Sequence, residues 1–152
     1  MPIGSANWVA EGMLRDLRNT RTGNHVSGFQ FTLTNQIFHG THPLGWIRSF
    51  RVDIDGSKLP ADAVDFVIRQ QAIPTSLLPE ISDSWWQPRE SVVIDVRLSG
   101  GLQPGRHLLG CDFMLASIIF TPSIDRRNFY RTMPGRLEAH LDLAIATEGE
   151  AA

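Results

Sequence analysis

Alternation of apolar and polar residues runs through most of the chain and predicts strands. In "SFRVDIDG", Phe50, Val52 and Ile54 alternate with arginine and aspartate, which gives one apolar and one wet face, as in an antiparallel sheet. The same period of two recurs in "GFQFTLTN" (28–35), "SVVIDVRLSG" (91–100) and "RLEAHLDLAIA" (136–146). Asp55-Gly56 supplies hairpin-turn chemistry, and "VDFVIR" (64–69) is the expected return strand.

Helix signals are weak by comparison. "AEGMLRDLRN" (10–19) is compatible with about two turns, with Met13, Leu14 and Leu17 on one side, although Gly12 disfavours them. "PSIDRRNFYRTM" (122–133) is compatible with one short turn. Nine prolines and thirteen glycines separate the short alternating segments. This pattern predicts an all-β fold, an antiparallel β-sandwich or jelly-roll-like single domain with little helix.

Length and charge narrow the possible partners. The 152 residues suit one domain over 1–152, with residues 1–25 an extended N-terminal segment and 147–152 a frayed acidic tail. The formal net charge of -2 gives no basic field, so we expect neither nucleic acid nor a membrane as partner.

No apolar run approaches the ~20 residues that span a bilayer, and no signal peptide is recognisable. We therefore expect a cytoplasmic protein.

The histidines do not form a metal-binding pattern. His39 and His42 are three residues apart, and the chain contains neither H-x-H nor H-E-x-x-H. Pro43 makes the segment extended or turned, so it cannot align the two rings as a helix would. We expect hydrogen-bonding loop histidines here and assign no metal ligand.

Motifs for catalysis are also missing from the sequence. There is no G-x-S-x-G and no phosphate-binding loop. Cys111 lies in the apolar run "HLLGCDFML" and is expected to be a packed thiol. Strand carboxylates fall mostly on polar faces, where solvation is expected: Asp53, Asp55, Asp95, Glu138 and Asp142. We assign no catalytic residue.

Bulky residues in loops are the remaining candidates. Trp85 and Trp86 are adjacent in "SDSWWQPRE", and neighbours in an extended chain point in opposite directions. One of the two can enter the core, and the other needs a different cover. Three interpretations stay open: the tryptophans close the core, form a protein interface, or form a ligand platform. The candidate interface or pocket-edge residues are His39, His42, Trp46, Arg48, Trp85 and Trp86.

The segment "NQIFHGTHPLGWIRSFRVDIDGSKLP", with "DFVIRQQ" and "SWWQPRE" after it, resembles the small (β) subunit of bacterial C-glycoside deglycosidases. The resemblance spans roughly residues 28–145, and "PLGWIRSFRVDIDG" with the downstream F-x-I-R is its most distinctive part. It implies a β-sandwich that packs on a larger α subunit and borders the substrate entrance. No family catalytic residue maps onto this chain.

The resemblance also implies the reaction of the complex. Such enzymes cleave the carbon–carbon bond between a 3-oxo sugar and a flavonoid-like aromatic aglycone by proton abstraction and elimination. The acid/base residues and a divalent metal, Mn²⁺ for example, belong to a TIM-barrel α subunit that holds most of the substrate, and the β subunit has no cofactor of its own. Two other functions stay open: a stand-alone cupin-like metal enzyme and a carbohydrate-binding module.

Overall fold

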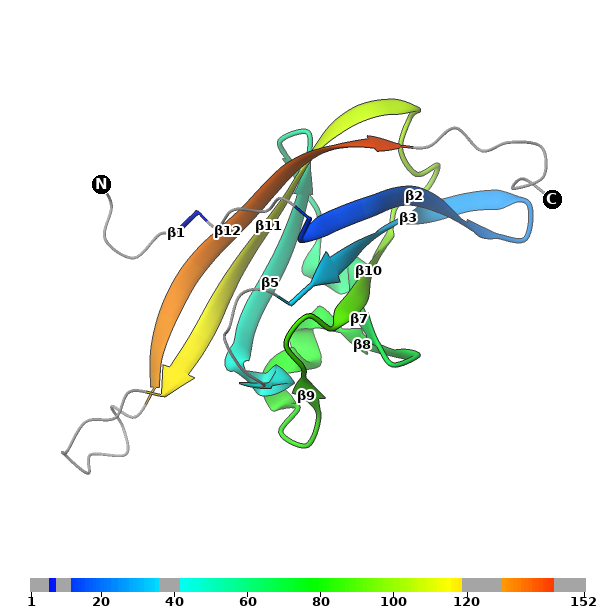
Figure 1. The fold of residues 1–152 in the computed structure, drawn as a ribbon. Coiled ribbons are helices and arrows are strands. Elements are labelled where there is room, and N and C mark those ends of the chain that lie inside the picture. Colours follow the sequence, from blue (N-terminus) through cyan, green and yellow to red (C-terminus); the bar gives the residue numbers. More distant parts are fainter. Residues whose placement is uncertain (1–5, 8–11, 36–41, 119–129, 144–152) are drawn as a thin grey trace.

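Two antiparallel sheets make up most of the computed structural model, which describes residues 6–7, 12–35, 42–118 and 130–143 (Figure 1). The first sheet has the order β1 (Ala6–Asn7), β12 (Tyr130–Leu143), β11 (Gly105–Ile118), β5 (Ile47–Ile54), β6 (Ser57–Lys58). The second has the order β2 (Leu14–Thr22), β3 (His25–Thr34), β10 (Ser91–Arg97), β7 (Val64–Ile68), β8 (Gln71–Pro74). Only the β1–β12 pairing among these is parallel. The all-β fold class is thereby confirmed.

Short elements connect the sheets at one end of the molecule. A two-residue ladder joins β4 (His42–Pro43) to β9 (Trp85–Trp86). Three short 3₁₀ helices accompany it: η1 (Leu44–Trp46), η2 (Ala61–Ala63) and η3 (Thr75–Glu80). No helix in the described part of the chain is both long and apolar enough to cross a membrane.

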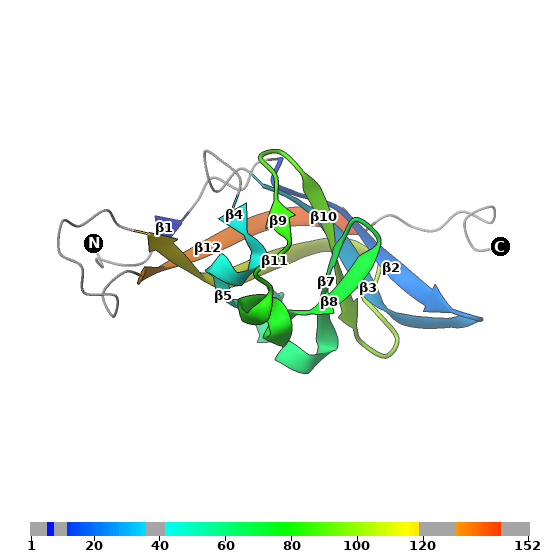
Figure 2. The ribbon, with the colours of Figure 1, turned by 90° about the horizontal axis from the view of Figure 1, so that it is seen from below.

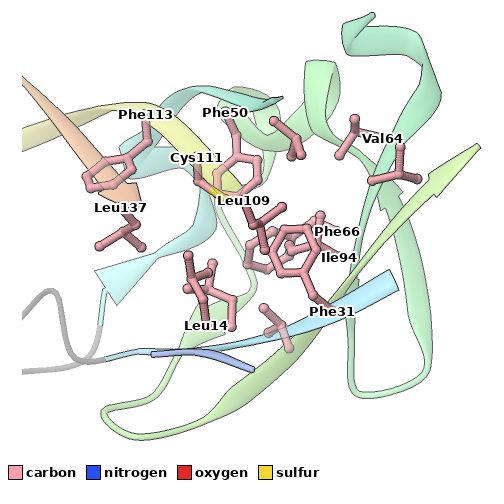
Figure 3. Close-up of a cluster of buried hydrophobic side chains, with 14 of the residues drawn as sticks. Leu14, Phe31, Phe50, Val64, Phe66, Ile94, Leu109, Cys111, Phe113 and Leu137 are labelled. Carbon is pink, nitrogen blue, oxygen red and sulfur yellow. The ribbon is translucent and has the colours of Figure 1, made fainter. Parts of the chain in front are cut away.

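A single hydrophobic core lies between the two sheets (Figure 3). Leu109, Cys111 and Phe113 of β11 face it from the first sheet, and Phe31 and Ile94 face it from the second. All five are at most 4% exposed. The alternation in the sequence therefore identified the inward face of these strands correctly.

The helix considered for residues 10–19 is wrong, because Leu14–Thr22 forms strand β2. Leu14 and Leu17 are both buried although they are three positions apart, which would place them on opposite faces of a regular strand. A bulge between Arg15 and Arg18, with Asp16 at φ 59°, adds one residue to β2 relative to β3. The extra residue returns Leu17 to the inner face, so a bulged strand reproduces the spacing of a helix.

The expected hairpin after Ile54 is only half correct. Asp55 and Gly56 do form a turn, with φ of 50° and 85°, but its return strand is β6, two residues long. Pro60 cannot donate to a ladder, and η2 then carries the chain to the second sheet. Val64–Ile68 therefore pairs with β10 and β8 instead of β5.

The expected turn in 122–133 falls mostly outside the described residues, and the tail at 147–152 falls wholly outside them. Residues 130–133 begin β12. Residues 14–22 of the predicted extended N-terminal segment are paired in the second sheet.

Candidate functional site

The end of the molecule that carries β4, β9, η1 and η3 holds most of the candidate residues (Figure 2). The ladder pairs His42 with Trp86 and Pro43 with Trp85. Beyond it, the Leu44 N–H donates to Ser84 O at 2.9 Å, and the Gly45 N–H donates to Ile81 O at 2.8 Å. These bonds fasten the segment that follows the ladder to the chain between η3 and β9.

Gly45 is required by this close contact. A Cβ at this position would lie 2.8 Å from Ile81 O and 3.2 Å from Pro79 O, both backbone atoms. Neither oxygen can move without shifting η3 or the residues after it. A side chain here would therefore separate η1 from η3.

The two adjacent tryptophans point in opposite directions, as the sequence predicts. Trp86 is 1% exposed, meets the ring of Phe66 edge to face at 5.3 Å, and donates its Nε1–H to Glu90 O at 2.9 Å. Trp85 is 46% exposed. Trp86 thus belongs to the core, whereas Trp85 is available to another molecule.

Arg69 organises the loop around the tryptophans, and sequence reasoning gave it no role of its own. Its Nη1 pairs with Glu90 Oε2 at 2.6 Å, and its Nη2 donates to Ser84 Oγ at 3.0 Å and Trp85 O at 2.9 Å. Glu90 Oε1 accepts from the Gln87 N–H at 2.9 Å. Arg69 lies in the turn between β7 and β8, so only the folded pairing brings it to this loop.

A hollow of about 430 Å³ opens beside this ladder. Trp46 of η1 and Arg48 of β5 both line it. The other lining residues are Pro43, Gly45, Pro79, Ile81, Ser82 and Ala116. Its volume falls within the ~300–1,000 Å³ of ordinary small-molecule sites.

Arg48 is fixed across the hollow by backbone oxygens. Its Nη1 donates to Gly45 O at 3.0 Å and to Pro79 O at 3.2 Å. One acceptor comes from η1 and the other from η3, so the guanidinium links two walls. Its remaining N–H groups have no acceptor among the described residues.

The two histidine candidates cannot be placed as fully. His39 lies outside the described residues, and His42 is described only through its backbone pairing with Trp86. Among residues 6–7, 12–35, 42–118 and 130–143, no three His, Cys, Asp or Glu side chains gather closely enough to hold a metal ion.

A second polar cluster lies on the outer face of the first sheet and corrects one expectation. Asp53 is only 6% exposed and does not face solvent as predicted. Arg136 grips it through two bonds of 2.7 and 2.9 Å and also reaches Asp112 at 3.0 Å and Glu138 at 3.3 Å. Gly110 makes room, since a Cβ there would lie 2.3 Å from Arg136 Nη2.

The charges in this cluster bind one another tightly. Hydrogen bonds to Asp53 and then Asp112 raise the pKa of Arg136 above its already high ordinary value. On the inner face of the sheet, burial raises the pKa of the Cys111 thiol, so the thiol stays protonated and is a packing group. We therefore assign the Arg136 cluster and Cys111 a role in stabilising the first sheet.

A histidine–aspartate pair closes the opposite end of the first sheet. His107 Nδ1 lies 2.6 Å from Asp55 Oδ2, and Nε2 lies 2.7 Å from Gln103 O. The hydrogen bond to Asp55 raises the pKa of His107, and the same bond lowers the pKa of Asp55. The pair joins the β5–β6 turn to the start of β11.

The family model for the C-glycoside deglycosidase beta subunit matches residues 13–118, more than half of the 152-residue chain. The chain belongs to this family. No curated protein matches its sequence. A beta subunit implies at least one other subunit, so this member of the C-glycoside deglycosidase beta subunit family is part of a heteromeric enzyme.

The family match covers the hollow and the two tryptophans but not the last strand. It contains Trp46, Arg48, Trp85, Trp86 and all the described residues that line the hollow. It ends before β12, and therefore before the arginine that grips Asp53. The match begins and ends earlier than the stretch in which the sequence resembled these deglycosidases.

Proposed function

We propose that this chain is the accessory subunit of a C-glycoside deglycosidase that cleaves the carbon–carbon bond between a 3-oxo sugar and an aromatic aglycone. The observation that carries the proposal is the family match over residues 13–118. The catalytic acid/base residues, and a divalent metal such as Mn²⁺, belong to a TIM-barrel α subunit. A ketone at C3 acidifies the adjacent C–H, so proton removal there starts the elimination of the aglycone.

The end with β9 and η3 is the surface proposed to dock on the α subunit. Among the described residues, Trp85 and Leu77 are the large apolar side chains that stay exposed, at 46% and 49%. They belong to β9 and η3, the same end that holds the hollow. Tryptophan is enriched among residues that dominate binding energy, so Trp85 is the better anchor candidate.

Co-expression with the proposed TIM-barrel α subunit tests the proposal. The two chains should purify as one complex that releases aglycone from a 3-oxo-C-glycoside. A lone stable chain beside a TIM-barrel protein that is fully active without it would refute the proposal.

The Trp85→Ala substitution tests the docking surface. It should weaken subunit association by ~2 kcal/mol or more if Trp85 sits near the interface centre, as measured by sedimentation of mixed subunits. Val93→Ala is the control, because Val93 alternates with buried residues of β10 and lies on the outer face of the second sheet. Equal association of the two variants would remove Trp85 from the interface.

A further inference from the structure

The hollow between η1 and η3 combines flat apolar walls with one fixed positive charge. The Trp46 indole, the rings of Pro43 and Pro79, and the Ile81 side chain supply the apolar surface. Indole and proline rings suit a flat ligand, and an aromatic ring packs well against indole.

Among the described residues that line the hollow, Arg48 is the one that carries a charge. Its Nη1 is occupied by two carbonyl oxygens, and its Nη2 and Nε have no acceptor in the described part of the chain. Those two groups form one edge of the guanidinium, the edge that takes a carboxylate or phenolate with paired hydrogen bonds. The backbone bonds orient this edge before a ligand arrives, which lowers the cost of binding.

Arg48 forms no ion pair with a carboxylate of the described residues, whose ion pairs all involve other basic side chains. Arg69, Arg97 and Arg136 each pair with an acid within 3.0 Å. A charge that has no counter-ion among the described residues, in a concave and mostly apolar site, favours an anionic ligand.

We infer that the hollow binds a flat aromatic ligand that carries an anionic group, with the ring on Trp46 and the anion on the Nη2–Nε edge of Arg48. The identity of this ligand rests on the proposed function: it is the aglycone end of the glycoside. The hollow then sorts aglycones by their acidic substituent, while the sugar reacts on the α subunit.

Calorimetric titration of the full chain with naphthalene-2-carboxylate, and with the neutral naphthalene-2-carboxamide, tests the site. The carboxylate should bind the wild-type chain, and Arg48→Gln should weaken it at least tenfold with little effect on the carboxamide. Arg51→Gln is the matched control, because Arg51 is exposed on the same strand and does not line the hollow. Its affinity should stay within twofold of wild type.

A second variant guards against a change in the walls, since Arg48 also links η1 to η3. Ser82 is exposed and lines the hollow without a bond to Arg48. Ser82→Leu should fill the space and weaken both probes. Failure of the carboxylate to bind, or binding that ignores both Arg48→Gln and Ser82→Leu, would overturn the site.

The assembled enzyme tests the link to the aglycone. Arg48→Gln should raise KM at least tenfold for a 3-oxo-C-glycoside with a carboxylated aglycone, relative to a neutral one, with kcat within about twofold. An unchanged KM ratio beside lost naphthoate binding would overturn the aglycone assignment, and loss of the complex itself would show that Arg48 holds an α-subunit acid instead. If the wild-type chain joins no deglycosidase at all, the proposed function fails while the titration still decides the site.

Discussion

Arg136 and Arg48 are both held in place by the fold, but by different partners. Arg136 lies flat over Gly110, and the carboxylates of Asp53 and Asp112 take its hydrogen bonds. Arg48 is held by the backbone oxygens of η1 and η3 through a single nitrogen. A guanidinium neutralised by acids is part of the scaffold, whereas one oriented by carbonyls keeps its charge for a ligand.

The surroundings of the two arginines differ in the same way. Arg136 belongs to β12, which pairs regularly with β11 along all fourteen residues of both strands. Arg48 is the second residue of β5 and lines a hollow beside the short elements β4, η1 and η3. Regular strand pairing therefore positions Arg136, whereas a few turn residues and backbone hydrogen bonds position Arg48.

The largest expected effect is on the free energy of unfolding, and it comes from replacing the buried Trp86. Trp86→Ala should lower the free energy of unfolding by about 3–5 kcal/mol, because it leaves a cavity beside Phe66 and deletes the bond to Glu90 O. Denaturant titration followed by circular dichroism measures it. Trp85→Ala, on the exposed neighbour, should cost less than about 1 kcal/mol. Similar losses for the two would contradict the assignment of one tryptophan to the core.

Replacing each arginine in turn tests the comparison itself. Arg136→Gln should cost about 2–3 kcal/mol in unfolding free energy, because Asp53 stays buried without its cation while the other acids reach solvent. Arg48→Gln should cost less than about 1 kcal/mol, since it deletes bonds at an exposed site. A larger loss for Arg48→Gln than for Arg136→Gln would reverse the roles assigned to them.

The smallest expected effect depends on pH. Because the folded pKa of His107 is raised, its stabilisation is full below the unfolded value near 6.5 and is lost as pH rises through the folded pKa. The lowered pKa of Asp55 makes its share present above about 3.8 and lost in more acidic solution. The stability difference between wild type and His107→Gln should therefore be larger at pH 5.5 than at pH 8.5. It should stay below about 1 kcal/mol, because Asp55 is half exposed. A difference that grows toward alkaline pH would contradict the pairing.

Local patterns predicted the features that depend on near neighbours. The alternation in residues 50–54, the Asp55-Gly56 turn and the opposite directions of Trp85 and Trp86 need only the geometry of an extended chain. Alternation failed at the bulge near Asp16, because one added residue gave Leu14 and Leu17 the spacing of a helix and the strand was read as helical.

Features that depend on distant pairing could not be predicted. Asp53 and Arg136 are 83 residues apart, and β11 must lie between their strands before the bond forms. Pro79 is 31 residues from Arg48, so nothing in "GWIRSF" shows that η3 orients the guanidinium. The crossing of Val64–Ile68 to the second sheet is a third case.

Reconstitution from separately purified subunits tests the central claim most directly. Aglycone release from a 3-oxo-C-glycoside is measured for this chain alone, for the proposed α subunit alone, and for their mixture at increasing ratios. We predict turnover that rises with added chain and saturates at a fixed subunit ratio, with none from the chain by itself. Turnover by the isolated chain, or a rate from the proposed α subunit that the chain does not change, would contradict this prediction.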